Sequence, residues 1–326
     1  MTPVRELEPP IDATLVDQLA SLWEQAFHVA GEALPPILAG EEADANRDFL
    51  YVAEVDGEVV GTTHLTIGRR DVTIGGLGEV AVRPKFRRRG LATALCMRAR
   101  DRFRELGGSA LFLGTVNPSA ARVYQRLGWR RLAGSTVMAC ISDDRSPEEF
   151  IVDYFRSRNS VRSVSVSPGA ALDRVPMIPL LLAPHDSQVL DANLSLYSTR
   201  YQVQNSCMGL YPRYNELGKD QKGAWFAAHA GEGLLVGLGS ARVNERGRGR
   251  VDAMSHPRYG ATWDKLVHAA TSWAEAHGAS VEALVSIEDE EKLAWFERHG
   301  LRPGPDRETT TFQLDGRTLN ALRLTR

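Results

Sequence analysis

An arginine cluster directly in front of a predicted helix is the first sign of chemistry in this sequence. In the stretch "FRRRGLATAL", Arg87, Arg88 and Arg89 precede Gly90 and a helix-like apolar pattern. Basic side chains are favoured at the last turn of a helix, whereas an anion is favoured at its first turn. Gly90 would let the backbone approach a ligand, and Ala92 would leave it room. We therefore expect this loop to bind a phosphate, the alternative being a solvated basic turn.

A second pattern begins 25 residues after Ala92, in the stretch "NPSAARVYQRLGW". Asn117 and Pro118 are typical of the N-cap and of the first position of a helix. The predicted helix carries Tyr124 and ends near Gly128. The almost wholly apolar run "ALFLGTV" before it predicts a buried strand.

The two patterns lie in a first half that alternates strand and helix signals. Helical spacing of apolar residues predicts helices over 15–34 and 90–106, the second ending at Gly107. Two β-rich runs around Asp56 and Gly57 predict a hairpin. The strand "LGEVAV" follows it and leads to the arginine cluster.

The second half repeats this order, with "MIPLLLAPHD" as a strand, "DSQVLDANLSLYSTRY" as a helix, and then a hairpin, strand, helix, strand and helix. At a constant offset of 172, Gly300 falls on Gly128, Phe296 on Tyr124 and Asp289 on Asn117. The sequence thus predicts two copies of one α/β domain, at 1–145 and 177–326. The Ser-, Pro- and Gly-rich region at 146–176 is the predicted linker region.

Composition narrows the partners and the location. The 326 residues have a formal net charge of -2, which argues against general nucleic-acid binding. Cys96, Cys140 and Cys207 are far apart and odd in number, which suits a reduced cytoplasmic setting and no metal site. The N-terminus lacks the pattern of a signal peptide, and the longest apolar run is too short to span a bilayer, so we expect no membrane association.

Together the two patterns resemble the motifs of the GNAT superfamily of N-acetyltransferases. Arg87–Ala92 is similar to the signature R/Q-x-x-G-x-G/A, and "NPSAARVYQRLGW" is similar to the second motif. The resemblance covers 1–141 well and 177–326 as a degenerate copy. It implies an α/β (α+β) fold of two GNAT-like domains. Each would be a mixed, mostly antiparallel twisted sheet flanked by helices, with strands 4 and 5 splayed apart.

The resemblance also implies acetyl-CoA as the cosubstrate and assigns its site. The pyrophosphate would lie at the arginine-glycine loop, the pantetheine arm in the gap between the splayed strands, and an N–H near Val80 against the thioester carbonyl. The implied cofactor-binding residues are Val80, Ala81, Val82, Arg87, Arg88, Arg89, Gly90, Leu91, Ala92, Thr93 and Asn117. Asn117 could instead serve as a helix cap alone.

Tyr124 is the candidate general acid for the departing thiolate, unless it is a packed core tyrosine. Some relatives carry a glutamate, which acts as the general base, five residues before the asparagine, but Phe112 stands there in this sequence. Glu79 is the best substitute, because a carboxyl in an apolar strand is costly to bury unless it is paired or working. A solvated Glu79, His64 as the base, and a water chain stay open as alternatives.

The second copy departs from the family pattern. "SHPRYGATWDKL" lacks the arginine cluster, Phe296 replaces Tyr124, and Asp289 replaces Asn117 beside further acidic residues. We therefore expect a structural or substrate-shaping role for this copy. The aromatic-rich segment Leu196–Tyr214 lies where the family usually builds its acceptor site.

The resulting hypothesis is an acyltransferase that moves an acetyl group from acetyl-CoA to a primary amine of a small molecule, such as an antibiotic or a secondary metabolite. Direct attack of the amine, with Tyr124 as general acid, is the expected mechanism. A protein or peptide N-acetyltransferase and a non-enzymatic acyl-CoA sensor are the alternatives.

Overall fold

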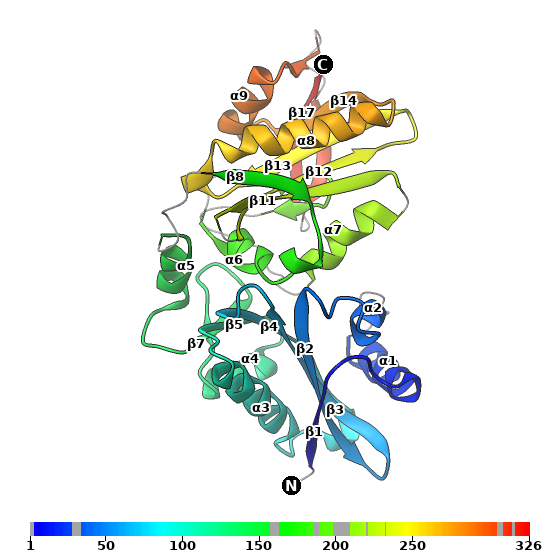
Figure 1. Cartoon of the computed structure of the whole chain (residues 1–326), viewed down its shortest axis with the longest axis vertical. Coiled ribbons are helices and arrows are strands. Elements are labelled where there is room, and N and C mark those ends of the chain that lie inside the picture. The colour runs from blue at the N-terminus through cyan, green and yellow to red at the C-terminus, as the bar shows by residue number, and fades with distance from the viewer. Residues whose placement is uncertain are drawn as a thin grey trace. The chain divides into compact units, whose positions relative to one another are not determined.

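The computed structural model describes residues 3–27, 34–156, 163–184, 189–197, 209–219, 221–231, 233–304, 309–314 and 317–326. These residues divide into two compact units (Figure 1). The first unit runs to Phe150 and includes the later segment Arg174–Ile178. The second unit comprises Ile151–Asp173 and the described residues from Pro179 onward.

The first unit is built on a seven-stranded sheet of order β1-β2-β3-β4-β5-β7-β6. Its strands are β1 (Val4–Leu7), β2 (Asn46–Val55), β3 (Glu58–Gly68), β4 (Ile74–Val82), β5 (Ala110–Gly114), β6 (Arg130–Arg131) and β7 (Val137–Ile141). Its helices are α1 (Ala13–Phe27), α2 (Pro35–Leu38), α3 (Leu91–Glu105) and α4 (Pro118–Arg126). Only β4 and β5 pair in parallel, so the sheet is mixed and mostly antiparallel.

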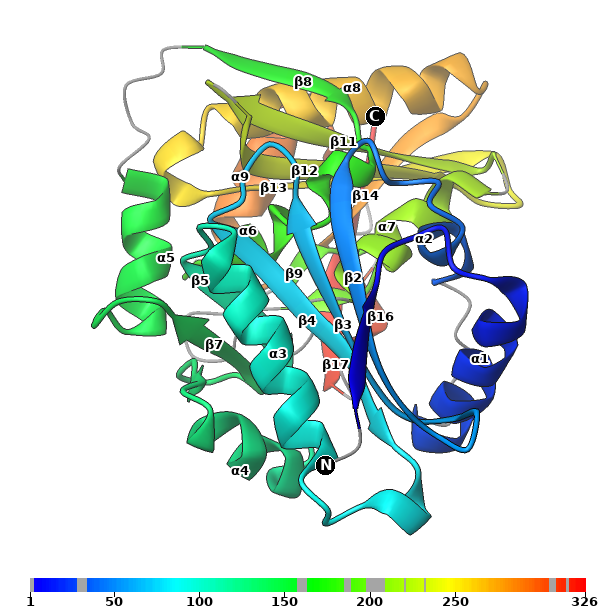
Figure 2. The ribbon, with the colours of Figure 1, turned by 60° about the horizontal axis from the view of Figure 1, so that its bottom comes forward.

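Both faces of the first sheet are covered by helices. Side chains alternate along β2, so Tyr51 belongs to the core on one face and Leu50 to the core on the other. Helix α3 crosses the first face (Figure 2). It buries Leu91, Leu95, Cys96, Ala99 and Phe103 there. Helix α1 buries Leu19, Leu22 and Trp23 on the opposite face.

The second unit repeats this topology in a sheet of order β8-β11-β12-β13-β14-β17-β15, with β16 paired to β17. Its strands are β8 (Val164–Pro168), β11 (Gly223–Ala230), β12 (Leu234–Val243), β13 (Arg248–Ser255), β14 (Ser280–Ser286), β15 (Arg302–Pro303), β16 (Thr309–Leu314) and β17 (Arg317–Thr325). Its main helices are α7 (Leu210–Lys219), α8 (Thr262–Ala276) and α9 (Glu290–Arg298). Here too one pair, β13 with β14, is parallel.

The strand order and the single parallel pair match between the two sheets. The β2–β3 hairpin corresponds to β11–β12, and β4 and β5 correspond to β13 and β14. This agreement confirms the predicted α/β fold of two GNAT-like domains with mixed, mostly antiparallel sheets.

Two predicted elements near the start of the second half are wrong. The run "MIPLLLAPHD" forms helix α6 (Met177–Leu182) and not a strand. A short apolar run has no period to separate the two, and Pro179 fits the first turn of a helix. The segment predicted as a helix after it holds the short strands β9 (Val189–Asp191) and β10 (Leu196–Tyr197), which pair with each other. Asp, Asn and Ser between them favour a turn, and Ser195 has a φ of 53°.

Two elements lie within the predicted linker region at 146–176. They are helix α5 (Pro147–Arg156) and strand β8, which pairs with β11 at the edge of the second sheet. The alternation of Val and Ser in "VRSVSVSP" explains the strand. Of the aromatic-rich segment Leu196–Tyr214, residues 198–208 lie outside the described residues.

The turn from α3 into β5 yields a stability prediction. A Cβ atom added at Gly108 would lie 2.3 to 2.4 Å from three atoms of the Phe103 ring, which is almost fully buried. Gly108→Ala should therefore lower the free energy of unfolding by about 1–3 kcal/mol, because the ring cannot move without disturbing the core. Urea denaturation would measure this. In Gly68→Ala the nearest neighbour is at 3.4 Å, so this control should change little, and equal losses would contradict the argument.

Candidate active site

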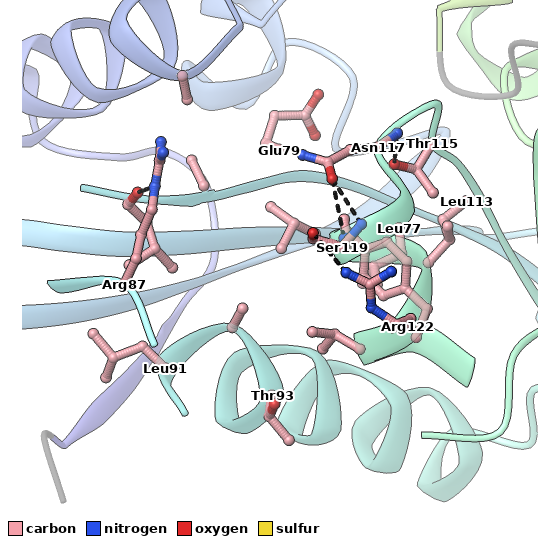
Figure 3. A pocket seen from close by; sticks show the side chains of 18 of the residues that line it. Leu77, Glu79, Arg87, Leu91, Thr93, Leu113, Thr115, Asn117, Ser119 and Arg122 are labelled. Carbon is pink, nitrogen blue, oxygen red and sulfur yellow. Dashed lines mark hydrogen bonds between the residues drawn. The ribbon is translucent and has the colours of Figure 1, made fainter. Parts of the chain in front are cut away.

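The divergence of β4 and β5 creates the main cavity described in the first domain. The two strands pair only from Ile74 to Gly76, whereas β4 continues to Val82. A cavity of about 1520 Å³ lies along the diverging strands (Figure 3). It is lined by the ends of β4 and β5, the loop before α3, the first turns of α3 and α4, and the end of α1. The predicted splay of strands 4 and 5 is thus confirmed.

The arginine-glycine loop forms one end of this cavity. After a short 3-10 turn at Pro84–Phe86, Arg88 and Gly90 adopt left-handed φ angles of 62° and 79°. Gly90 is the N-cap of α3, and such a cap leaves the first N–H groups of the helix without helical partners. Free N–H groups at the start of a helix are a feature that phosphate sites use.

Most of the predicted cofactor residues are brought together here. The cavity is lined by Val80, Ala81, Val82, Arg87, Arg88, Gly90, Leu91, Ala92, Thr93 and Asn117. Arg87 also donates from Nε to the Val82 carbonyl at 2.9 Å, which fixes its side chain along the strand end. Arg89 does not line the cavity, because its guanidinium lies over the Phe86 ring at 5.4 Å from the ring centroid.

Four lining arginines make the cavity electropositive. Arg87 and Arg88 come from the loop, and Arg122 and Arg126 come from α4. Glu79 is the one carboxylate among the described lining residues. The sequence analysis missed Arg122 and Arg126, whose i, i+4 spacing was the available signal that both lie on one helix face. Such a balance favours an anionic ligand with one cationic group near Glu79.

A β-bulge places Glu79 at the cavity. Thr62 pairs with Ala81 and His64 pairs with Gly78, so Glu79 and Val80 together lie opposite one residue of β3. Glu79 has a φ of 50°, which is a costly angle for a residue with a side chain. The Thr62 hydroxyl donates to the Glu79 carbonyl at 2.7 Å and so supports this backbone. A bulge removes one residue's backbone groups from the ladder, which is how a strand can offer an N–H to a ligand.

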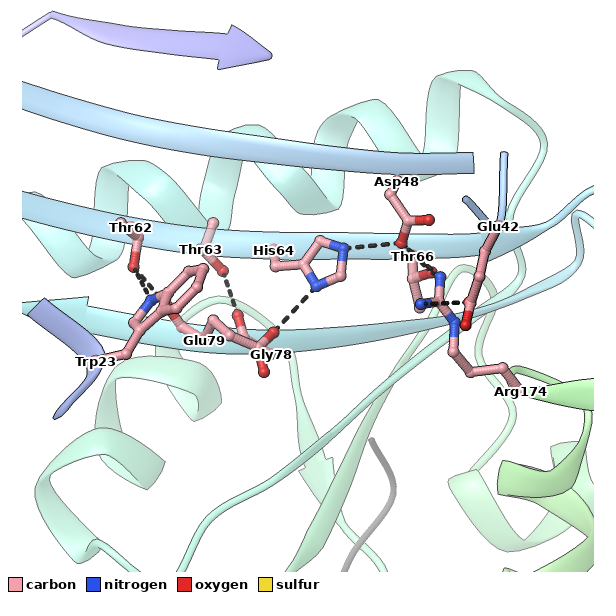
Figure 4. Close-up of polar contacts among 10 residues, drawn as sticks. All are labelled: Trp23, Glu42, Asp48, Thr62, Thr63, His64, Thr66, Gly78, Glu79 and Arg174. Atoms are coloured by element: carbon pink, nitrogen blue, oxygen red, sulfur yellow. Dashed lines mark hydrogen bonds and ion pairs between the residues drawn. The ribbon is translucent and has the colours of Figure 1, made fainter. Parts of the chain in front are cut away.

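The Glu79 carboxylate is tied to a buried row of polar groups (Figure 4). Its Oε2 lies 3.1 Å from His64 Nδ1, and His64 Nε2 lies 2.8 Å from Asp48 Oδ1. Burial alone would lower the pKa of His64, but its bonds to Asp48 and Glu79 outweigh this and raise the pKa to about 9. Burial alone would raise the pKa of Asp48, but His64, Arg174 and Thr66 lower it to about 2. At neutral pH, His64 is therefore an imidazolium between two carboxylates.

Tyr124 lines the same cavity from α4. Its side chain is 6 % exposed, and its ring lies tilted against Trp129 at 6.2 Å between centroids. Burial raises the pKa of the Tyr124 hydroxyl well above its usual value, with a smaller contribution from Cys96. The phenol is therefore protonated at neutral pH, as a proton donor must be before it acts.

Asn117 caps helix α4. Its Oδ1 accepts from the backbone N–H of Ser119 at 2.9 Å and of Ala120 at 3.3 Å. The cap leaves the rest of the amide beside the cavity, which Asn117 also lines. Phe112, at the position where some relatives carry the base, is fully buried and lies outside the lining residues.

Comparisons with known proteins place this site in a family. The model of the acetyltransferase (GNAT) family matches residues 16–129. A curated acetyltransferase of Photorhabdus laumondii is 30% identical over 108 residues, which are 33% of this chain and 73% of that protein. The chain belongs to the GNAT acetyltransferase family. This membership confirms the predicted acyltransferase class of enzyme.

Solved structures of GNAT enzymes were also matched. One, an acetyltransferase of the GNAT family from Streptococcus pneumoniae, is 14% identical, with a TM-score of 0.36 over 50% of this chain and 99% of that one. Another, spermidine N-acetyltransferase from Vibrio cholerae in complex with CoA and spermine, is 15% identical, with a TM-score of 0.37 over 49% and 93%. Likenesses at this level say nothing about the substrate of this GNAT enzyme.

The family match ends before the second domain. Lys292 from α9 is buried and places Nζ 2.5 Å from Asp252 Oδ1 on β13. The ladder between β12 and β13 runs from Gly237 to Val243 without a register shift, so it lacks the bulge seen at Glu79. No helix in the described part of this GNAT enzyme has both the length and the apolar character needed to cross a membrane.

The His64 row predicts a pH dependence of stability. Its folded pKa of about 9 lies above the ordinary 6.5, so its contribution is complete below pH 6.5 and is lost as the pH rises through 9. The contribution of Asp48, whose pKa of about 2 lies below 3.8, is complete above pH 3.8 and is lost as the pH falls through 2. Unfolding by urea from pH 6 to 10 should show the first loss.

The matched variants are His64→Gln and His277→Gln. His64→Gln should flatten the decline in stability between pH 6.5 and 9, because the amide does not titrate. His277 is exposed, and its substitution should leave the decline as in the wild type. A decline that persists in His64→Gln would mean that another group causes it.

Proposed function

We propose that this enzyme transfers an acetyl group from acetyl-CoA to a primary amine of a small molecule, and that the first domain, 1–145, carries the active site. The observation that carries the proposal is that the α3 N-terminus, Glu79 and Tyr124 all line the same cavity between the splayed strands. These are an anion site, a proton acceptor and a proton donor, which are the groups that acyl transfer to an amine requires.

The cofactor assignment follows the shape and charge of the cavity. The diphosphate of acetyl-CoA would lie on the N–H groups of the first turn of α3, with Arg87 and Arg88 beside it. The pantetheine arm would follow the backbone of Val80–Val82 into the gap between β4 and β5. This path leads the thioester to the bulge, where the N–H of Val80 would bind the carbonyl oxygen.

The proposed chemistry is a direct transfer. The amine nitrogen attacks the thioester carbon, and the negative charge that develops on the oxygen is held by the bulge N–H. Glu79 takes the proton from the attacking nitrogen. The carbon–sulfur bond then breaks, and the departing thiolate takes its proton from the Tyr124 hydroxyl. The products are an acetamide and CoA.

We assign the second domain, 177–326, a structural or substrate-shaping role, joined through the region 146–176. Phe296, which stands in the position of Tyr124, is fully buried and packs edge-on against Trp263 at 4.8 Å. It has no proton to donate. A buried ion pair between Lys292 and Asp252 joins α9 to β13 in this domain.

Binding of acetyl-CoA tests the assignment of the domain. In Gly90→Trp the indole would enter the anion site from a left-handed backbone position, so calorimetry should show loss of binding. Gly260 lies one residue before Ala261, the N-cap of α8 in the second domain, and its nearest neighbour would be at 3.7 Å from an added Cβ. Gly260→Trp should keep one site per chain. Binding that survives Gly90→Trp and is lost in Gly260→Trp would assign the activity to the second domain.

Turnover tests the role of Tyr124. Tyr124→Phe keeps the ring against Trp129 but removes the proton donor, so kcat with an amine substrate should fall about 100-fold or more while the Kd for acetyl-CoA stays unchanged. The control is Tyr154→Phe, another tyrosine that is 6 % exposed but does not line the cavity. Wild-type kcat in Tyr124→Phe would exclude it as the acid. Binding of acetyl-CoA with no turnover of any amine would favour a sensor.

A further inference from the structure

A buried row of charged groups connects the cavity to the segment that follows the first sheet in the chain (Figure 4). Beyond Glu79 and His64, Asp48 Oδ1 accepts from Thr66 Oγ1 at 2.6 Å and lies 2.6 Å from the Arg174 guanidinium. The same guanidinium lies 3.0 Å from Glu42 Oε2. His64, Asp48 and Arg174 are at most 8 % exposed, so this row is buried along most of its length.

We propose that Arg174, Asp48 and His64 are positioning residues for the transfer reaction, holding the Glu79 carboxylate in place at the cavity. The inference rests on the proposed function and deepens it. Arg174 comes after α5 and β8 in the chain, yet it belongs to the first compact unit, where it contacts β2 and β3. The site in the first domain would thus depend on a residue outside 1–145.

The order of the contacts indicates that the effect runs from Arg174 through Asp48 and His64 to Glu79. Arginine keeps its charge at every relevant pH, so Arg174 fixes the negative charge of buried Asp48. Asp48 in turn keeps His64 protonated, and both ring nitrogens of an imidazolium are donors. One N–H is used by Asp48, and the other must point at Glu79. Each member therefore limits the next to one orientation.

The consequence for Glu79 is a fixed carboxylate. Among the described residues, His64 is the one partner of this carboxylate, and it binds Oε2. The Glu79 side chain is 20% exposed at the cavity wall, and fixing such a side chain costs rotamer entropy. A charge-assisted hydrogen bond from His64 offsets this cost. Oε1 is then left for the proton of the attacking nitrogen.

His64 is not itself the proton acceptor in this arrangement. The charged groups that face it are Asp48 from β2 and Glu79 from β4, with Arg174 and Glu42 behind Asp48. An imidazolium enclosed in this way has no free lone pair at neutral pH. Its effect on the reaction must pass through Glu79, and this can be measured.

The test is a double-mutant cycle between His64 and Glu79. His64→Gln should lower kcat about 10- to 100-fold in the wild-type background, because a carboxylate that is no longer fixed is misplaced. In the Glu79→Gln background the same change should have almost no effect, since there is no carboxylate left to position. The Kd for acetyl-CoA should be unchanged in all four proteins. A merely structural role would give the same loss in both backgrounds.

Arg174 is tested in the same way. Arg174→Met should lower kcat about 10-fold or more, and Arg174→Lys, which keeps the charge but not the planar fork, should lower it less. Because Arg174→Met removes the guanidinium from a buried ion pair with Asp48 and can prevent folding, Thr66→Val is the milder second variant. It removes one donor to Asp48 at nearly constant shape. His229→Gln is the matched control, since His229 forms a similar pair with Asp173 at 2.6 Å in the second unit.

The outcomes separate this inference from the proposed function. Equal losses in both Glu79 backgrounds, or wild-type kcat in His64→Gln, would overturn the positioning role and leave acetyl transfer intact. Wild-type kcat in Glu79→Gln would show that Glu79 is not the base, which would also end the inference. Absence of acetyl-CoA binding in the wild type would overturn the proposed function itself.

Discussion

The bulge at Glu79 and Val80 is the constraint on which the site depends. It breaks the regular ladder between β3 and β4 in the part of β4 that lies beyond its pairing with β5, which ends at Gly76. One irregularity therefore does two things: it turns backbone groups toward the cavity and aims a carboxyl at the same place. The left-handed angle of Glu79 costs on the order of 1–3 kcal/mol, which must be offset by its surroundings. The Thr62 hydroxyl and the His64 ring supply the contacts that do so.

The two sheets show that the fold alone does not make the site. They share strand order, the parallel pair and the helices that follow it. The second sheet nevertheless keeps a continuous ladder at the matching place, with Ser240 opposite Asp252. A buried lysine pairs with that aspartate. In the first sheet the diverging strands border a cavity lined by arginines, and in the second a lysine of α9 forms a buried ion pair with β13.

Sequence patterns correctly predicted the elements that depend on interactions between residues close together in the chain. The arginine-glycine loop, the cap at Asn117 and the hairpin at Asp56 and Gly57 depend on neighbours in the chain, and the structure forms all three. The helix at Met177–Leu182 was missed because an uninterrupted apolar run has no period. Arg174 was missed for a different reason: it meets Asp48 across 126 residues, and no spacing rule links such a pair.

Arg174 shows that a domain boundary read from the sequence repeat does not enclose every contact of the first sheet. The repeat places a boundary after the first sheet, since the second copy begins again with its own strands and helices. The ion pairs of Arg174 with Asp48 and Glu42 lie beyond that boundary in the chain. Arg174 pairs with Asp48 and Glu42, and removing one partner of a buried ion pair costs about 3–5 kcal/mol. The last strand of the first sheet ends at Ile141, whereas the ion pairs of its buried charged groups extend to Arg174.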